Sequence, residues 1–370
     1  MNMKKHIWLA GVLIGLLGAC SSASQKGKSE GQIDVLPSSC NRTSVCGIDG
    51  FYDTSTLVLK DSIVLEDRNI LNPHHIYYKD GFLIFNSIRG EREIQLLNLS
   101  TDEVTEYHVI GQGRNEMANY HTVNTKDEKM YLFADNHMGK VYGICLDSLR
   151  LNPKKEYELL YSLPVPKRGL FLRFMDLPKH VVGIGLLEDG RFGVFNKETD
   201  VFKGQMEYPG NETIQSLSYL HKGALFSRTL MASDATGKRM VATAFGLMDF
   251  YSISDDGDLS LLKSNHYHFP MFETGINGAA VVFKKEDRAG ITGMCVDKDY
   301  VYGLYSDRTM AEYGEGAYNA PYLLVWDWNS NPVKAYELPK SLCGFALDGN
   351  ILYGLSREDS PMVYVFELEE

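Results

Sequence analysis

The sequence lacks the clusters of basic residues that nucleic-acid-binding proteins use to neutralise phosphate. Aspartate and glutamate outnumber lysine and arginine by 48 to 37, so the 370-residue chain has a formal net charge of −11. No basic stretch carries interleaved aromatic side chains. Because phosphate recognition needs a positive surface, we do not expect nucleic acid to be a partner.

The sequence also lacks a long apolar run and a CxxC pair of cysteines. The apolar run from Ile7 to Leu17 is far shorter than the roughly 20 residues that a helix needs to cross a bilayer. No CxxC pair occurs among the six cysteines, which argues against a cysteine-based zinc site. Cys145, Cys295 and Cys343 lie in apolar segments typical of strands, where a thiol behaves as a small hydrophobic side chain.

The N-terminus has the order of a bacterial secretory signal. Lys4 and Lys5 precede the apolar run, and small residues follow it. The run Leu17-Gly18-Ala19-Cys20 resembles a bacterial lipobox, which implies that residues 1–19 are removed as a signal peptide and that Cys20 is acylated. The alternative is an ordinary secretory signal with a chance cysteine. Several acyl chains, at about 0.8 kcal/mol per buried methylene, would anchor the mature chain on a membrane.

Residues 20–53 are predicted to form a flexible tether, because Ser, Gly and Lys are frequent there and apolar residues are few. The sequence leaves open whether Cys40 and Cys46 form a disulfide, which an oxidising periplasm permits, or remain free thiols. Ser21 rather than Asp follows Cys20, and this resembles the sorting signal of outer-membrane lipoproteins. No acidic cluster typical of surface-exported lipoproteins follows, so we expect a cell-envelope protein on the outer membrane, facing the periplasm.

From about residue 54 the chain consists of short β-branched and aromatic runs bounded by polar turns, which predicts an all-β protein. One unit, a polar turn followed by a strong strand, recurs six times. Its strands are anchored at Phe82, Met130, Val181, Met240, Val301 and Leu352. The anchors are 48, 51, 59, 61 and 51 residues apart. Each interval matches one four-stranded propeller blade with its loops.

The repeat therefore predicts one six-bladed β-propeller over residues 54–370. The sixth unit ends at Glu370 after only three strands. A strand at 56–59 or at 62–65 is available to complete it, and this pairing would close the ring and cover its free edges. A two-sheet sandwich followed by a second β domain is the alternative, but it predicts no regular spacing.

On these features the chain resembles the TolB-like six-bladed propeller lipoproteins of Bacteroidota, most of which are uncharacterised. Besides the lipobox and the six units, the resemblance rests on the segment Ile110–Glu116 and on Thr236–Phe245, which leads into Phe250–Ile253. Relatives often carry a Gly-x-Gly-Pro-Gly-Glu-like loop at the first place, where this chain has Arg114-Asn115 instead of Pro-Gly. The resemblance implies the six-bladed fold and assigns no activity.

Arg173 and Arg228 are candidate binding residues, because each lies in an apolar segment that is predicted to be an innermost strand. Innermost strands line the axial channel, where a guanidinium group needs a carboxylate or solvent. One interpretation is a salt bridge across the channel. The other is recognition of an anion or a peptide carboxylate at the channel mouth.

Tyr313 and Tyr318 are the other two candidates. They belong to a Gly- and Tyr-rich stretch, residues 305–322, between the second and third strands of the fifth unit. Tyrosine and glycine together give the adaptable contact area that recognition loops use. The alternative is an ordinary insertion that packs on its own side chains.

Metal and catalytic sites are not expected. His266 and His268 have the spacing of metal ligands on one strand face, but their place before Pro270 suits an exposed outer strand. Lactonase-type propellers aim carboxylates from several blades at one ion. The candidates for such a role here are Asp176, Asp234, Glu273 and Asp297. Acidic turns are expected for solubility anyway, so we predict no metal and no cofactor.

The sequence thus predicts a membrane-tethered, non-catalytic binding or scaffold propeller that recognises a protein, peptide or glycan in the cell envelope. The alternative is a metal-dependent hydrolase of the lactonase or esterase type.

Overall fold

The computed structural model describes residues 50–369 of the chain, which belong to one compact unit. Within this range the gaps are 88–91, 111–115, 118–119, 124–129, 136–138, 153–156, 164–168, 276–279 and 359. The predicted signal peptide and most of the predicted tether lie outside the described residues, so what is expected of Cys20, Cys40 and Cys46 remains a prediction. Residues 111–115, which include Arg114, lie outside them as well.

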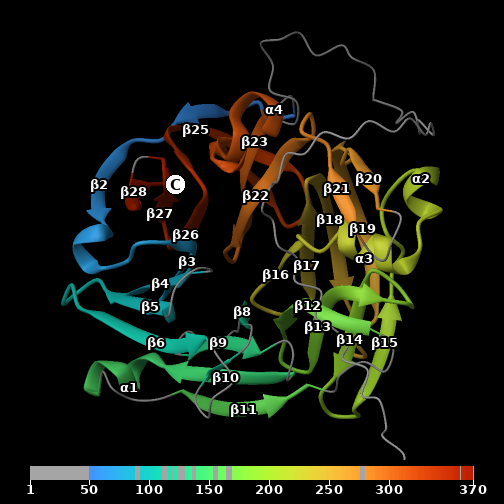
Figure 1. Ribbon diagram of the computed structural model, residues 1–370, viewed down its shortest axis with the longest axis horizontal. Helices are drawn as coiled ribbons and strands as arrows, with labels where there is room; N and C mark the ends of the chain where they lie inside the picture. The colour runs from blue at the N-terminus through green and yellow to red at the C-terminus, as the bar shows by residue number, and fades with distance from the viewer. Residues whose placement is uncertain are drawn as a thin grey trace, which may run out of the picture. The chain divides into compact units, whose positions relative to one another are not determined.

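Six sheets arranged in a ring form a six-bladed β-propeller (Figure 1). From the innermost strand outward, blade I consists of β3 (Pro73–Lys79), β4 (Phe82–Ser87), β5 (Arg92–Asn98), β6 (Val104–Ile110) and β7 (Glu116–Met117). Blade II consists of β8 (Tyr120–Val123), β9 (Met130–Asp135), β10 (Lys140–Cys145) and β11 (Glu158–Ser162). Blade III consists of β12 (Gly169–Asp176), β13 (His180–Leu187), β14 (Phe192–Asn196) and β15 (Val201–Gln205).

The second half of the ring repeats this order. Blade IV consists of β16 (Leu230–Ser233), β17 (Arg239–Ala244), β18 (Gly246–Ile253) and β19 (Leu259–His268). Blade V consists of β22 (Arg288–Val296), β23 (Tyr300–Thr309), β24 (Ala320–Asp327), β25 (Pro332–Leu342) and β1 (Thr54–Thr56). Blade VI consists of β26 (Gly344–Asp348), β27 (Ile351–Ser356), β28 (Met362–Glu367) and β2 (Leu59–Val64).

Short helices and one hairpin lie between these strands. The helices are η1 (Glu66–Arg68), α1 (Leu146–Leu151), α2 (Glu212–Gln215), α3 (Tyr219–Leu225), α4 (Met310–Tyr313) and η2 (Gly314–Tyr318). The hairpin pairs β20 (Phe272–Thr274) with β21 (Val281–Phe283). In the described part of the chain, every helix is too short and too polar to traverse a bilayer.

The six recurring strands of the sequence are β4, β9, β13, β17, β23 and β27, which are the second strands of the six blades. A second strand is flanked by strands within its blade and by neighbouring blades on its two faces. All six residues of β4, for example, are buried. Strands that are buried on both faces have near-continuous apolar sequences, and this explains why the repeat is visible. The predicted six-bladed fold is confirmed.

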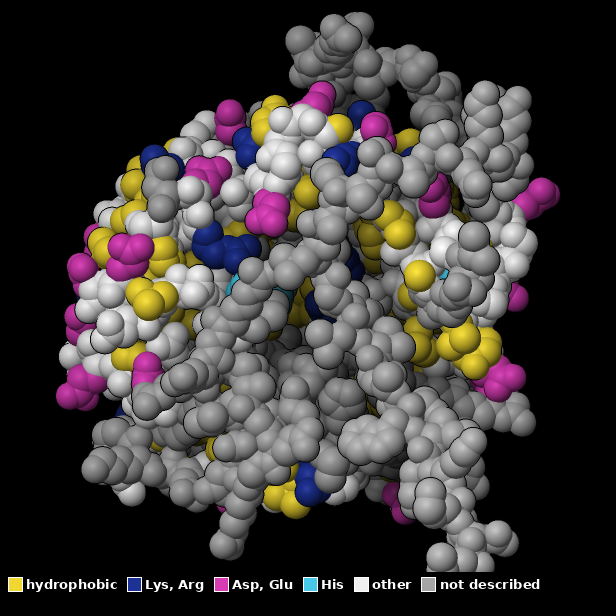
Figure 2. Space-filling model, in the orientation of Figure 1, with side chains coloured by type: hydrophobic (Ala, Val, Ile, Leu, Met, Phe, Trp, Pro, Cys, Tyr) yellow, Lys and Arg dark blue, Asp and Glu magenta, His cyan; other side chains and the backbone are white. Residues whose placement is uncertain are grey.

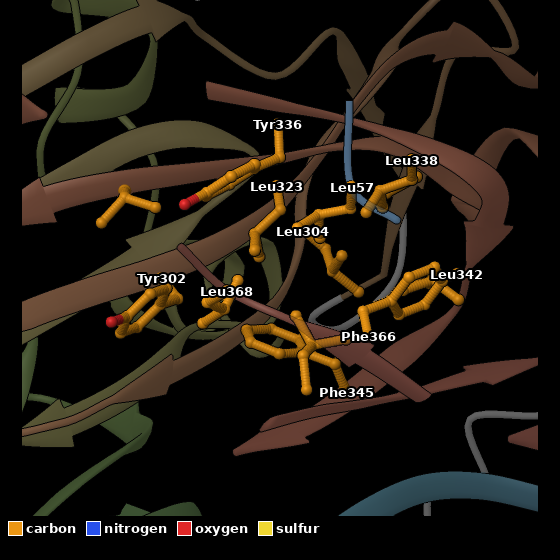
Figure 3. Packing of buried hydrophobic residues seen from close by; sticks show 13 residues of the cluster. Leu57, Tyr302, Leu304, Leu323, Tyr336, Leu338, Leu342, Phe345, Phe366 and Leu368 are labelled. Atoms are coloured by element: carbon orange, nitrogen blue, oxygen red, sulfur yellow. The ribbon is translucent and has the colours of Figure 1, made fainter. Parts of the chain in front are cut away.

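The N-terminal strands close the ring. β2 pairs with β28 in antiparallel orientation and supplies the missing strand of blade VI, as predicted. β1 was not expected and pairs in parallel with β25 on the outside of blade V. Between them, Leu57 packs with Leu304, Leu323 and Phe366 in a core shared by both blades (Figure 3). Burial of such a side chain contributes about 1.5–3 kcal/mol, so the segment joins blades V and VI through its side chains as well as its backbone.

All inner strands begin on one side of the ring. Because adjacent strands in a blade are antiparallel, each second strand ends on that same side: Leu230 pairs with Thr243, and Arg288 with Thr309. We call this side the upper face. It carries the connections between blades and those between second and third strands, while the other hairpin turns lie on the lower face.

One predicted inner strand is wrong. The segment 225–230 around Arg228 is not a strand, because α3 occupies residues up to Leu225 and β16 begins only at Leu230. The Ser218 hydroxyl accepts the backbone N–H of His221 and caps this helix. At Gly223 a Cβ atom would lie 2.5 Å from the Gly185 carbonyl oxygen, so glycine lets the helix approach blade III. Arg228 therefore lies in a turn, whereas Arg173 lies on inner strand β12 as predicted.

Candidate functional site

Cationic and imidazole side chains from four blades gather around the propeller axis on the upper face. Arg173 comes from β12, Arg228 from the turn before β16, and Arg357 directly follows β27. His74 and His75 lie near the start of β3. We call these five residues the axial cluster. Figure 2 shows lysine or arginine side chains beside histidine near the centre of the ring.

Arg228 and Tyr318, two of the four predicted binding residues, are brought together. The Arg228 Nη1 donates a hydrogen bond of 3.0 Å to the Tyr318 hydroxyl. The Arg228 guanidinium carbon lies 5.6 Å from the centre of the Tyr318 ring and 5.5 Å from that of Phe283. Tyr318 belongs to η2 of blade V and Phe283 to the β20–β21 hairpin. Two segments, η2 and the β20–β21 hairpin, thus hold this guanidinium group in place.

Arg173 faces other cations. Desolvation lowers its pKa; Tyr77 opposes this effect, and the positive charge of Arg228 adds to it. An arginine nevertheless stays protonated. Among the described residues, no carboxylate forms an ion pair with Arg173, Arg228 or Arg357. The predicted salt bridge across the channel is therefore not seen in this part of the chain.

Blades I and VI contribute the other side of the cluster. The Arg357 Nη1 lies 3.2 Å from the His74 Nδ1, so Arg357 donates and His74 accepts. His75 is an exposed residue of β3, and Arg173, His74 and Arg357 act on it by their charges. Desolvation, followed by the positive charges of Arg173, His74 and Arg357, lowers the pKa of His75 to about 3. His75 is consequently neutral at pH 7, and the charge of the cluster comes chiefly from its arginines.

Tyr313, the fourth predicted residue, pairs with Arg308, whose guanidinium carbon lies 4.9 Å from the centre of its ring. The surrounding loop folds on itself. Thr309 caps α4 by accepting the N–H of Glu312, and Arg308 donates to the Asn319 carbonyl oxygen. This local packing leaves Tyr313 54% exposed on the upper face. The loop thus combines internal packing with an aromatic side chain that is free to contact a ligand.

The carboxylates considered for metal binding do not converge. Asp176 pairs with Lys197, Asp234 with Arg239, Glu273 with Lys284, and Asp297 caps the backbone of its own turn. Across the described residues, no three or more His, Cys, Asp or Glu side chains are grouped so that they could hold a metal ion.

His266 and His268 lie on outer strand β19, as predicted, but both are half-buried rather than exposed. The His266 Nε2 lies 2.9 Å from the Asp249 Oδ1. His268 packs closely over Gly246, and desolvation, together with the charge of Arg288, lowers the pKa of His268 to about 4. The contacts of both rings are therefore with protein groups.

A buried ion pair behind the axial cluster was missed from the sequence. The Arg191 Nη1 lies 2.5 Å from the Asp249 Oδ2, and both residues are 1% exposed. The Arg191 guanidinium carbon also lies 5.5 Å from the centre of the Phe226 ring, two residues before Arg228. The pair thus joins blade III to blade IV and supports the turn that carries Arg228. An aspartate inside the apolar run of β18 was the available signal.

The sequence matches the family model described as TolB-like 6-blade propeller-like over residues 53–350. No curated protein matches it. A solved member of the DUF4221 family from Bacteroides vulgatus is similar, with a TM-score of 0.51 and 11% identity, covering 85% of this chain and 97% of that chain. A protein of unknown function from Bacteroides thetaiotaomicron has a TM-score of 0.51 and 13% identity, covering 86% of this chain and 75% of that one. At such identities these two likenesses bear on the fold alone.

Proposed function

This chain belongs to the TolB-like six-bladed propeller family, and we propose that it is a non-catalytic binding propeller that recognises a protein, peptide or glycan on its upper face. The observation that carries the proposal is the axial cluster. Four blades contribute these side chains around the axis, and among the described residues no carboxylate forms an ion pair with Arg173, Arg228 or Arg357. A ligand that covers the axial cluster would contact several blades at once.

The scaffold supports such a role because it holds the contact groups rigidly. Arg228 is fixed by Tyr318 and Phe283, and the turn beneath it rests on buried Arg191. Binding residues that are already ordered lose little conformational entropy when a ligand arrives. Loops on a rigid scaffold are also the usual place for binding residues. The upper face combines both features.

We further propose that the propeller is held in the cell envelope by lipid on Cys20, on the outer membrane and facing the periplasm. The support is the lipobox-like sequence, followed by Ser21. A Cys20→Ser variant should be released from the membrane fraction into the soluble fraction, because one side chain carries the anchor. If this variant stayed with the membranes as fully as the parent, lipid attachment at Cys20 would be ruled out.

Site-directed photo-crosslinking tests the upper face directly. A photoreactive amino acid at Tyr313 is compared with one at Leu262 on β19, since the two positions are 54% and 55% exposed. We expect one dominant adduct in intact cells from position 313 and none from position 262. Protease or periodate treatment of the adduct then separates a protein from a glycan. Equal labelling from both positions, or none from 313, would contradict the proposal.

The non-catalytic part has its own test. Purified mature protein is assayed against a panel of lactones and esters, with and without EDTA. We expect no turnover above the rate of a heat-denatured sample. Metal-dependent turnover that is lost on addition of EDTA would overturn this part of the proposal and favour the hydrolase alternative.

A further inference from the structure

We propose that the axial cluster binds the C-terminal carboxylate of a neutral peptide through Arg173, Arg228 and Arg357. This inference rests on the proposed function and names the ligand chemistry at the same site. It goes beyond that function by stating which group of the ligand is recognised and which residues recognise it.

The first argument is the arrangement of charge. Arg173 and Arg228 are close enough for their charges to interact, and His75 interacts with both Arg173 and Arg357. The guanidinium groups of Arg173 and Arg228, from blades III and IV, are therefore neighbours, and that of Arg357, from blade VI, lies near the same His75 ring as Arg173. Like charges in a partly desolvated place repel each other more strongly than in water. An anion placed among them would replace repulsion by attraction.

The second argument is that neighbouring side chains orient two of the guanidinium groups. Arg357 is held by His74, at 3.2 Å, and Arg228 by Tyr318, at 3.0 Å. Each of these contacts engages one terminal nitrogen. The planar guanidinium fork has five donor hydrogens, so donors remain for a ligand. Its geometry matches the two oxygens of a carboxylate.

The third argument separates a peptide from a sugar. The arginines donate hydrogen bonds and cannot accept them, whereas sugar hydroxyl groups need acceptors as well as donors. Next to Arg228, the rings of Phe283 and Tyr318 offer apolar surface for the side chain of a terminal residue. A carboxylate with an apolar neighbour, as at the end of a peptide, fits this combination.

The fourth argument concerns the rest of the molecule. The chain as a whole carries a formal charge of −11, so its long-range field repels polyanions. A single carboxylate on an otherwise neutral chain avoids most of this repulsion. It still reaches the arginines, because salt at physiological concentration screens the charge of the rest of the molecule beyond about 8 Å. This favours a C-terminus over an acidic peptide or a polyuronate.

The test uses a pool of neutral hexapeptides, each with an apolar last residue and a neutral N-terminal fluorophore. One pool has free C-termini and a matched pool has amidated C-termini. Binding to the mature full-length chain is followed by fluorescence anisotropy. We expect the free-carboxylate pool to bind at least about tenfold more tightly, because hydrogen bonds between charged groups are worth more than those between neutral ones.

Variants assign the effect to residues. Arg228→Gln and Arg173→Met should each weaken binding of the free-carboxylate pool by about tenfold or more and leave the amidated pool unchanged. Lys340→Gln removes one exposed charge at the outer strand of blade V and serves as the matched control, with no change expected. Circular dichroism and the melting temperature confirm that each variant is folded. A variant that fails to fold is replaced by Arg357→Gln, whose side chain is exposed.

The outcomes distinguish failure of the carboxylate inference from failure of the proposed binding function. Equal binding of the free and amidated pools, or no binding of either, would overturn the carboxylate inference. Displacement of the free pool by millimolar inorganic phosphate or glucuronate, but not by the matched peptides without label, would identify a phosphate or a uronate as the ligand chemistry instead. In all these cases a specific adduct at Tyr313 would leave the binding function standing, whereas loss of that adduct as well would remove both.

Discussion

The buried pair of Arg191 and Asp249 makes Asp249→Asn an informative substitution. Asparagine keeps the size of the side chain but removes its charge, and the Arg191 guanidinium is then left uncompensated at 1% exposure. Breaking a buried ion pair on one side costs about 3–5 kcal/mol. We therefore expect a loss of that order in the free energy of unfolding at pH 7, which is a large share of the stability of an ordinary domain.

The same ion pair should make the free energy of unfolding depend on pH. Burial opposes ionisation of Asp249, but hydrogen bonds from His266 and Arg191 and the charge of Arg191 lower the pKa of Asp249 from 3.8 to about 2. A folded-state pKa below the unfolded value stabilises the protein at any pH above the unfolded value. A difference of nearly two pKa units corresponds to about 2 kcal/mol. This contribution to the free energy of unfolding is lost as the pH falls from about 4 to about 2. The Asp249→Asn variant should not show this decrease.

Urea unfolding at pH 7 and at pH 3, followed by tryptophan fluorescence, measures both effects. Asp258→Asn is the control, because this carboxylate is largely exposed and its ion pair with Lys203 lies at the surface. The double variant Arg191→Met with Asp249→Leu removes both charges and should recover most of the lost stability. The reasoning would be refuted if Asp249→Asn cost less than about 1 kcal/mol, as an exposed pair would, or if the double variant were no more stable than the single one.

Three further predictions concern the scaffold. The Trp326 Nε1 donates a hydrogen bond of 3.1 Å to the Tyr267 hydroxyl in the core. Tyr267→Phe removes this acceptor and should lower the free energy of unfolding by about 1–3 kcal/mol in urea titrations. Gly290→Ala places a Cβ 2.3 Å from the backbone of blade IV at a φ of +72°, so a lower melting temperature is expected by calorimetry. Gly316→Ala, with open space around it, should not change that temperature. Removal of β1 and β2 exposes the edge of β28 and should give aggregates in size-exclusion chromatography, whereas a chain that starts at residue 50 should not aggregate.

The fold could be predicted because second strands such as β4 and β13 are buried on both faces and therefore carry a continuous apolar run. Such runs can be recognised in the sequence whatever loops connect them. α3 could not be predicted in the same way. Its residues Leu220 and Leu225 look like strand residues. Its close approach to blade III depends on Gly223, which meets the Gly185 carbonyl oxygen only in the folded chain.

The candidate site was accessible in part. Arg173 and Arg228 stood out because a charged residue within an apolar segment needs an explanation. The contact between Arg228 and Tyr318 joins residues 90 positions apart, and the contact between His74 and Arg357 joins residues 283 positions apart. Nothing in the local sequence encodes such pairs, since they arise from the rotation that places the blades around one axis. Charged residues at the start of inner strands or at the end of second strands are the general signal that would have found them.

The central claim is that a ligand carboxylate binds the axial cluster, and a crystal structure of the mature chain with a tight-binding member of the free-carboxylate pool tests it most directly. We predict a carboxylate with oxygens about 2.7–2.9 Å from guanidinium nitrogens of Arg228 and of Arg173 or Arg357. A peptide bound on the lower face or along an outer strand, with the axial cluster in contact with solvent only, would contradict the account.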